Sequence, residues 1–198
     1  MSEIKKIKIS KENQSEDNLV WIDCEMTGLD RKKDKLVEIA CIITDGNLNI
    51  IAEGPDIVIH QDDETLRGMN LFVQNMHRNS GLTREIRNSK ISTKEAEDKI
   101  LSFIQEYAPY GKCPLAGNSV HCDKEFLRNE MPRIVEHLHY RIVDVSSIRE
   151  LCQRWYHNAY KMPKVGNHRA LIDIKESIKE LKFYRERAFK KNFGINAE

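Results

Sequence analysis

The sequence predicts an α/β protein whose mixed sheet opens with an antiparallel meander, continues in strand–helix units and is flanked by helices. Two observations carry this prediction. Short apolar runs separated by turn-forming residues fill the chain from residue 19 to about residue 60, and strand-like and helix-like segments alternate from residue 93 onward. Such alternation after a meander is typical of a mixed α/β sheet.

The predicted meander begins at residues 19–22 (LVWI), a buried strand that leads into the polar residues DCE. Further strands are expected over residues 36–44 and 57–60. The segment at 45–49 (DGNLN) is rich in Gly and Asn, which are typical of hairpin connections.

Helices and strands alternate in the second half of the chain. A helix is expected from Thr93, where apolar residues recur with helical spacing, to the stop at 109–111 (PYG). After it we expect a strand over 114–119, a helix over 123–137, a strand over 141–145, a helix over 146–156 and a last helix beginning near His168. The last helix carries an apolar stripe, which predicts that one of its faces packs on the sheet.

Length and composition indicate a single globular domain. The 198 residues are 40% hydrophobic and 32% charged, as in folded rather than disordered chains. Residues 1–17 mix lysine with acidic residues and predict a flexible leader, which leaves residues 18–198 as the folded domain. No apolar run approaches the ~20 residues that span a bilayer, and no secretory signal is recognised, so no membrane association is expected.

Cysteine content and net charge restrict the location and the partner. The five cysteines lack a C-x-x-C spacing, so neither a zinc knuckle nor a disulfide framework is expected. A reducing, cytoplasmic location is predicted, with the mitochondrion as an alternative. The net charge of +1 argues against a long polyanionic partner, because proteins that grip long nucleic acids neutralise many phosphates.

Two carboxylates follow the first predicted strand. Asp23 and Glu25 are two residues apart, so both side chains are expected on one face of the sheet. Adjacent carboxylates beside an apolar core repel each other, and a divalent cation such as Mg²⁺ or Mn²⁺ is the simplest compensating charge. Taken alone, the D-x-E pair is equally compatible with chance.

Three further residues extend this pattern. Asp123 follows the strand at 114–119 at the predicted start of a helix, where its side chain could equally cap that helix. His168 and Asp173 open the last predicted helix, and a histidine in such a place is more often structural than catalytic. Together with the D-x-E pair, the three residues form a constellation of four acids and one histidine.

The order and spacing of these residues resemble the DnaQ-type exonuclease superfamily, whose members use four acidic residues and a histidine. Over about residues 18–190 the chain is similar to the oligoribonuclease family. The matching segments are WIDCEMTGLD (21–30), LNIIAEGPDIVIHQ (48–61), GNSVHCDKEFL (117–127), HYRIVDVSS (139–147) and HRALIDIKESIKELKFYR (168–185). The VHCDK and HRA forms resemble eukaryotic members.

This resemblance implies a homodimeric RNase H-like domain with 3′→5′ exoribonuclease activity. The implied substrate is short single-stranded RNA of two to about five nucleotides, degraded to mononucleotides, a size that fits the near-zero net charge. Two divalent cations, Mg²⁺ or Mn²⁺, are implied. Their ligands would be Asp23, Glu25, Asp123 and Asp173.

The resemblance also implies roles for residues around the metal site. His168 would be the general base. Leu29 would wedge between two bases, Phe72 and His77 would contact the substrate, and Ser119 would belong to a cap on the 5′ phosphate. The neighbouring subunit would supply Tyr140, in a catalytic role, together with Arg141 and Ser146.

Two positions depart from the family pattern. Phe72 stands where a tryptophan is common, and a phenylalanine still stacks on a base with ~1–3 kcal/mol. Ile172 replaces a second aspartate, while Asp173, the expected ligand, is present. His137 and His139 have no nearby acid or cysteine and are interpreted as a surface or dimer-contact segment.

The implied chemistry is phosphodiester hydrolysis. Two metal ions ~3.5–4 Å apart would activate the attacking water and stabilise the departing 3′ oxygen, and a histidine exchanges protons near neutral pH. One alternative is a related exonuclease acting on DNA or on longer RNA 3′ ends. Another is a non-catalytic binding module, although such proteins usually lack one or more of the ligands.

Overall fold

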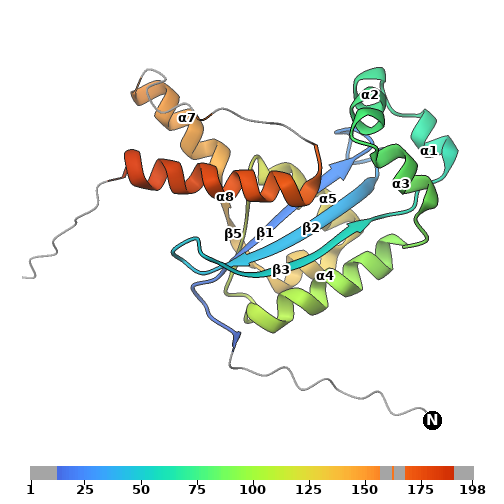
Figure 1. The fold of residues 1–198 in the computed structure, drawn as a ribbon. Helices are drawn as coiled ribbons and strands as arrows, with labels where there is room; N and C mark the ends of the chain where they lie inside the picture. Colours follow the sequence, from blue (N-terminus) through green and yellow to red (C-terminus); the bar gives the residue numbers. More distant parts are fainter. Residues whose placement is uncertain (1–12, 157–161, 163–167, 190–198) are drawn as a thin grey trace, which may run out of the picture.

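The computed structural model describes residues 13–156, 162 and 168–189, which form a five-stranded sheet with helices on both faces (Figure 1). The strands lie in the order β3-β2-β1-β4-β5. They are β1 (Leu19–Met26), β2 (Leu36–Thr44), β3 (Ile50–Val58), β4 (Pro114–Gly117) and β5 (His139–Asp144). Strands β1 to β3 pair antiparallel and β4 and β5 continue parallel to β1, which confirms the predicted mixed sheet.

Eight helices surround the sheet in the described part of the chain. They are α1 (Asp63–Arg67), α2 (Leu71–Asn79), α3 (Leu82–Asn88), α4 (Thr93–Tyr107), α5 (Val120–Glu130), α6 (Pro132–His137), α7 (Val145–Trp155) and α8 (Ala170–Arg187). No helix among them is long and apolar enough to cross a membrane.

The alternation of side chains along β1 divides the core into two layers. Val20, Ile22 and Cys24 face the layer that contains α4, α5 and α6. Trp21 faces the opposite layer, where α7 and α8 pack. Because side chains two apart share a face of a strand, Asp23 lies on the α8 side with Trp21.

Several predicted boundaries need correction. The third strand begins at Ile50 and not at residue 57, and most of its side chains are at least partly exposed because β3 is an edge strand. The helix expected over 123–137 is two helices that meet at Met131, since Pro132 lacks the N–H that a continuing helix requires. The last helix begins at Ala170, two residues after His168.

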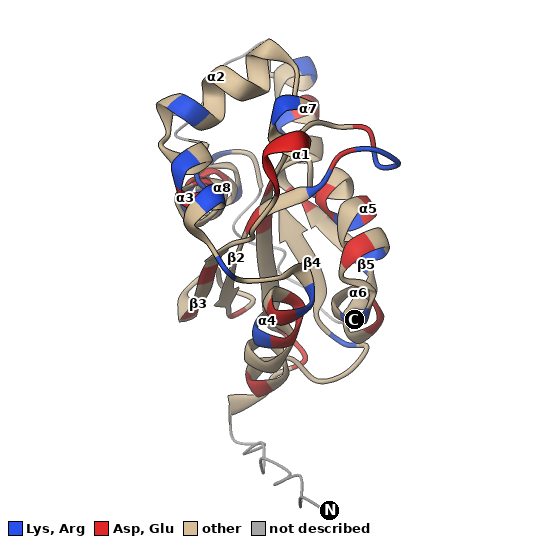
Figure 2. Cartoon of the chain, turned by 90° about the vertical axis from the view of Figure 1, so that its right-hand side faces the viewer, with Lys and Arg blue, Asp and Glu red and all other residues tan. Residues whose placement is uncertain are grey.

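The three short helices between residues 61 and 92 were not predicted. They gather at one end of the sheet (Figures 1 and 2), around a small apolar core of their own. Asp62 and Asn70 cap α1 and α2 with their side chains. Such capping residues are a signal of helix starts that the sequence did contain.

The division into a leader (1–17) and a domain (18–198) stays a prediction, and residues 1–12 lie outside the described part. The described end of the leader is attached to the domain. Gln14 Nε2 donates to Gln105 O at 2.7 Å and Ser15 N donates to Tyr107 O at 3.3 Å. All five cysteines are free in the structure.

Candidate active site

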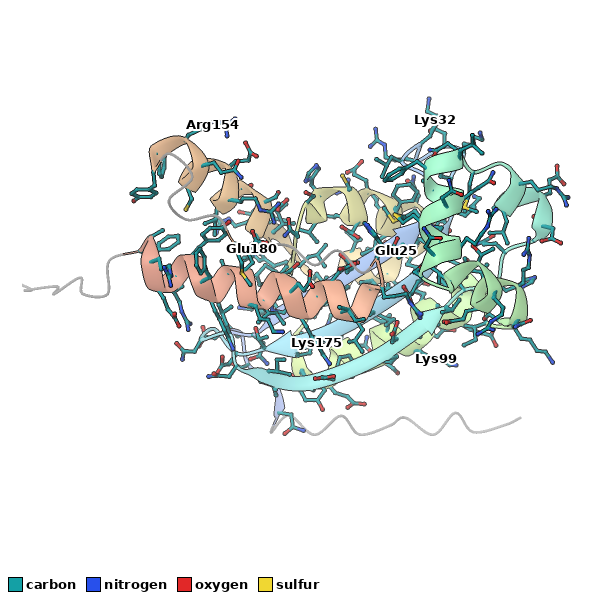
Figure 3. The ribbon with its side chains drawn as sticks, turned by 45° about the horizontal axis from the view of Figure 1, so that its top comes forward. Glu25, Lys32, Lys99, Arg154, Lys175 and Glu180 are labelled. Carbon is teal, nitrogen blue, oxygen red and sulfur yellow. The ribbon has the colours of Figure 1, made fainter. Side chains whose placement is uncertain are left out.

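A cavity of about 600 Å³ opens between β1, α5 and α8, large enough for a small ligand. Figure 3 labels Glu25 on β1 and Glu180 on α8, which both line it. Its other lining residues are Asp23, Cys24, Met26, Leu29, Asn118, Ser119, Cys122, Asp123, Met162, His168, Asp173, Glu176, Ser177 and Lys179. All five residues of the predicted metal and base cluster are therefore brought to one cavity.

The register of the sheet positions the first two carboxylates. Asp23 pairs with Ala40, and Glu25 pairs with Glu38 of β2. Trp21, Asp23 and Glu25 alternate with core residues along β1, so the two acids project toward α8 from the edge of an apolar layer. The expectation that they share a face is confirmed.

Asp123 is held against β1 by the backbone. Its Oδ1 accepts a hydrogen bond from Cys24 N at 2.9 Å, so the strand residue between Asp23 and Glu25 fixes the carboxylate of α5. Asp123 lies in the first turn of α5, whose N-cap residue is Ser119. The alternative interpretation of Asp123 as a helix cap is therefore wrong.

Glu25, His168 and Asp173 form a group of potential metal-binding atoms in the described part of the chain. One ligand atom from each lies within 4.8 Å of the other two. His168 has φ = 49°, in the left-handed region that is unfavourable for a side chain with a Cβ, and strain of this kind is concentrated at functional sites.

Burial and mutual repulsion make the cluster hard to ionise. Burial, followed by repulsion from Asp123, Asp173 and Glu25, raises the pKa of Asp23 well above its ordinary value. Burial and the charges of Asp173 and Glu38 raise the pKa of Glu25 to about 8. Burial likewise raises the pKa of Asp123 to about 7, although the hydrogen bond from Cys24 N acts to lower it.

These observations test whether the cavity fits a divalent cation. Several carboxylate oxygens and one imidazole line one cavity, repulsion between the acids raises the pKa of Asp23 and Glu25, and oxygen ligands of this kind suit Mg²⁺ or Mn²⁺. The donor set therefore fits a divalent metal, and the expected ligands Asp23, Glu25, Asp123 and Asp173 all line the cavity.

The thermal stability of the metal-free protein should fall as pH rises, and a bound divalent cation should offset this loss. A folded-state pKa above the unfolded value stabilises the fold at low pH, and this contribution is lost as pH rises through the folded pKa. For Glu25 and Asp123 that loss spans about pH 4 to pH 8. In chelator, the melting temperature should therefore fall over this range, and the gain on adding Mn²⁺ should grow with pH. A gain that is independent of pH would contradict the assignment.

Glu38, a fifth acid that no sequence pattern singled out, lies behind this cluster. Its side chain is fully buried, and Glu38 Oε1 accepts from Arg169 Nε at 2.8 Å while Oε2 accepts from Ala170 N at 3.1 Å. Arg169 also binds Glu85 of α3, through Nη1–Oε1 at 3.1 Å and Nη2–Oε2 at 2.8 Å. The Glu38–Arg169–Glu85 triad thus fixes the start of α8, directly between His168 and Asp173.

Arg169→Ala should destabilise the fold by about 3–5 kcal/mol, because it leaves the buried Glu38 charge without its partner. Arg169→Lys keeps the charge but loses the planar fork, so the loss should be smaller. Chemical denaturation measures the loss in the free energy of unfolding for both variants. Arg87→Ala is the control, because Arg87 forms an exposed ion pair with Asp63 and such pairs contribute ~0–1 kcal/mol. Equal losses for Arg169→Ala and Arg87→Ala would contradict the role of the triad.

His77 lies behind Glu25 rather than on the cavity surface, which corrects the expected substrate contact. The side chain is fully buried, its Nε2 lies 2.8 Å from Met26 O and its Nδ1 lies 3.9 Å from Glu25 Oε2. Burial lowers the pKa of His77 below its ordinary value. Its Nδ1 has no hydrogen-bond partner within the described residues, so the ring packs behind Glu25 without a hydrogen bond to it.

Two exposed apolar side chains flank His168. Leu29 is 77% exposed and lines the main cavity, while Phe72 is 75% exposed and lines a second cavity that also contains His168. Exposed apolar side chains of this size beside a polar site suit contacts with flat bases. The expected contacts of Leu29 and Phe72 with bases stay predictions.

Ser119 and Ser146 meet at one carboxylate. Asp144 Oδ1 accepts from Ser119 N at 2.9 Å, from Ser146 N at 2.9 Å and from Ser146 Oγ at 2.6 Å, and Asp144 Oδ2 lies 3.1 Å from His121 Nδ1. Burial opposes ionisation of Asp144, but these hydrogen bonds outweigh it and hold its pKa below the ordinary value. Ser146 therefore lies beside Ser119 within one chain.

Tyr140 and Arg141 lie on the outer surface of β5. Tyr140 is 73% exposed, and the Arg141 guanidinium lies 5.2 Å from its ring centroid. Neither residue lines the main cavity of this chain. His137, expected in a surface or dimer-contact segment, is instead buried, and its Nε2 lies 2.9 Å from Ala108 O.

Comparison with known proteins places this arrangement in a family. The family model described as Exonuclease matches residues 20–181. The chain is 54% identical over 175 residues to the human protein named "Oligoribonuclease, mitochondrial", covering 87% of this chain and 74% of the human one. It is also 54% identical over 177 residues to the oligoribonuclease of Rhodococcus jostii (strain RHA1), covering 88% and 89% of the two chains.

Solved structures share the fold. A zinc-bound complex of E. coli exonuclease I with single-stranded DNA superposes with a TM-score of 0.68 at 19% identity, over 88% of this chain and 41% of the E. coli chain. This chain thus spans about two fifths of the length of that enzyme. The likeness supports the fold, and the relatives that are more than half identical, together with the family model, show that the chain belongs to the oligoribonuclease family of exonucleases.

Proposed function

We propose that the chain is a 3′→5′ exoribonuclease that hydrolyses short oligoribonucleotides, down to dinucleotides, to mononucleotides. The chain belongs to a family of hydrolases whose members, from mammals to bacteria, are named oligoribonucleases. The observation that carries the proposal is the convergence of four carboxylates and His168 in one cavity. A phosphodiester with its 3′ end at this cluster is the substrate that such a constellation suits.

Substrate length is proposed to be limited at the 5′ end. Ser119 lines the cavity, so its hydroxyl would donate to a terminal phosphate, and Arg141 and Ser146 of a second copy are proposed to complete this cap. The net charge of +1 suits a ligand with few phosphates, because long strands are bound through many basic contacts.

The proposed cofactors are two divalent cations, Mg²⁺ or Mn²⁺, held by Asp23, Glu25, Asp123 and Asp173. When bound, they would supply Lewis-acid activation of water and charge stabilisation at the departing oxygen. The chain's own contribution is to keep these carboxylates together despite their repulsion, through the Cys24 N–H on Asp123.

His168 is proposed to accept the proton of the attacking water. Its ring lines the cavity beside Glu25 and Asp173, and imidazole accepts protons at neutral pH. Leu29 and Phe72, exposed on either side of His168, would hold the bases so that the scissile phosphate faces it.

A homodimer is proposed to complete the site. Tyr140 is 73% exposed and lies outside the cavity of its own chain, so a second copy is the source from which Tyr140 and Arg141 would reach the substrate. The mammalian relatives named mitochondrial support mitochondria as a location, beside the predicted cytoplasmic one.

The decisive experiment measures hydrolysis of 5′-labelled RNA of about two to ten nucleotides, and of matched DNA, with Mg²⁺, Mn²⁺ or chelator. Metal-dependent release of mononucleotides, fastest on the shortest RNA, is expected. Equal or higher rates on DNA or on the longest RNA would instead support the related exonuclease activity. No hydrolysis with either metal would support a binding module.

A further inference from the structure

A separate cavity of about 370 Å³ lies among the three short helices at the end of the sheet. We call it the arginine pocket. Its lining residues are Leu66, Arg67, Met69, Gln74, Arg78, Gly81, Thr83, Arg84 and Arg87. Figure 2 shows basic segments on α2 and α3, which lie beside each other at this end of the molecule.

The arginines line the pocket from three helices, and among these four Arg87 alone forms an ion pair in the described part of the chain. Arg87 Nε lies 2.7 Å from Asp63 Oδ1. Arg67, Arg78 and Arg84 form no ion pair with a carboxylate in the described part of the chain. A solvated basic face would spread its charges along one helix, whereas guanidinium groups gathered around a hollow favour a bound anion.

Apart from the arginine charges, the wall and the floor of the pocket also indicate a bound ligand. Thr83 Oγ1 is buried without a hydrogen-bond partner among the described residues, and such a group costs free energy until a ligand or water satisfies it. Leu66 and Met69 line the floor and belong to the local apolar core. An apolar floor below a basic rim suits an amphiphilic ligand with an anionic end.

Helix α2 separates this pocket from the catalytic cavity. Phe72, Met76 and Asn79 line the hollow that also contains His168, whereas Gln74 and Arg78 line the arginine pocket. At about 100° per residue, positions 74 and 78 each lie ~200° from position 76, so the two sets occupy opposite faces of α2. A phosphate in the arginine pocket would therefore not reach the catalytic carboxylates.

We propose that the arginine pocket is a second binding site for a nucleoside 5′-monophosphate, whose phosphate pairs with Arg67, Arg78 and Arg84. The Thr83 hydroxyl donates to a phosphate oxygen, and the nucleoside lies over Leu66 and Met69. Phosphate recognition rests on the pocket alone. The choice of a mononucleotide, the product of hydrolysis, rests on the proposed function.

Binding is measured by calorimetry with adenosine 5′-monophosphate in chelator. Without metal the catalytic carboxylates repel a phosphate, and no turnover takes place, so the result does not depend on activity. Arg78→Ala/Arg84→Ala should weaken binding by about tenfold to a hundredfold, as expected for charged hydrogen bonds. The control Arg185→Ala/Arg187→Ala removes the same charge from the far end of α8 and should bind as wild type does. Thr83→Val should weaken binding by about two- to tenfold.

Thermal melting without ligand checks that every variant is folded, and RNA hydrolysis by Arg78→Ala/Arg84→Ala should stay at the wild-type level. Adenosine should bind at least about tenfold more weakly than its monophosphate. Three results would each overturn the site. They are equal affinity of the two double variants for adenosine 5′-monophosphate, equal affinity of wild type for adenosine and its monophosphate, and no binding of the monophosphate by wild type. Orthophosphate that binds as tightly as the nucleotide would overturn the nucleotide assignment and leave a site for the free anion.

Discussion

Asp23→Asn is expected to remove nearly all turnover while leaving the metal-free protein at least as stable as wild type. Asparagine keeps the shape of the side chain but removes a charge from the proposed metal site, and the rate should fall by about three orders of magnitude or more. The stability of the metal-free fold should rise, because burial and repulsion from Asp123 and Asp173 raise the pKa of Asp23 well above its ordinary value. Removing a charge that the fold disfavours relieves this repulsion.

The measurements are RNA hydrolysis with Mn²⁺ and thermal melting in chelator at about pH 8. Asp56→Asn is the matched control, since burial raises the pKa of Asp56 to about 6 although it lies outside the catalytic cavity. The control should keep wild-type turnover. An Asp23→Asn protein that melts well below wild type would show that this carboxylate stabilises the fold.

His168→Ala is expected to lower kcat by about 10²- to 10⁴-fold, the usual contribution of a general base. RNA binding should change little, because Leu29 and Phe72 remain exposed on either side of the site.

The comparison requires KM and kcat of wild type and variant with the same metal, plus calorimetry with Mn²⁺ alone. His60→Ala is a suitable control, since His60 Nδ1 lies 3.2 Å from Ile86 O and does not line the catalytic cavity. An unchanged kcat, or a defect confined to Mn²⁺ affinity, would reject His168 as the base and assign it to metal binding.

The residues of the site could be predicted because local patterns encode them. The two-residue repeat of a strand directs Asp23 and Glu25 to one face, and the structure confirms this by their shared layer with Trp21. The start of α4 at Thr93 was likewise predictable, and the Ser92–Glu95 capping box accounts for it. The edge strand β3 was misplaced because its side chains are largely exposed and follow no apolar pattern.

The sequence by itself determined the sheet order of the meander, the set of acids and the histidine that accompanies them. Only the tertiary structure decided that Glu38, which interrupts an apolar run, binds Arg169 at a separation of 131 positions. It also moved His77 behind Glu25 and gathered arginines from three helices into one pocket. The physical reason is that sequence periodicity depends only on residues that are neighbours along the chain. The partners of a buried charge and the walls of a cavity are instead brought together by strand register and helix packing.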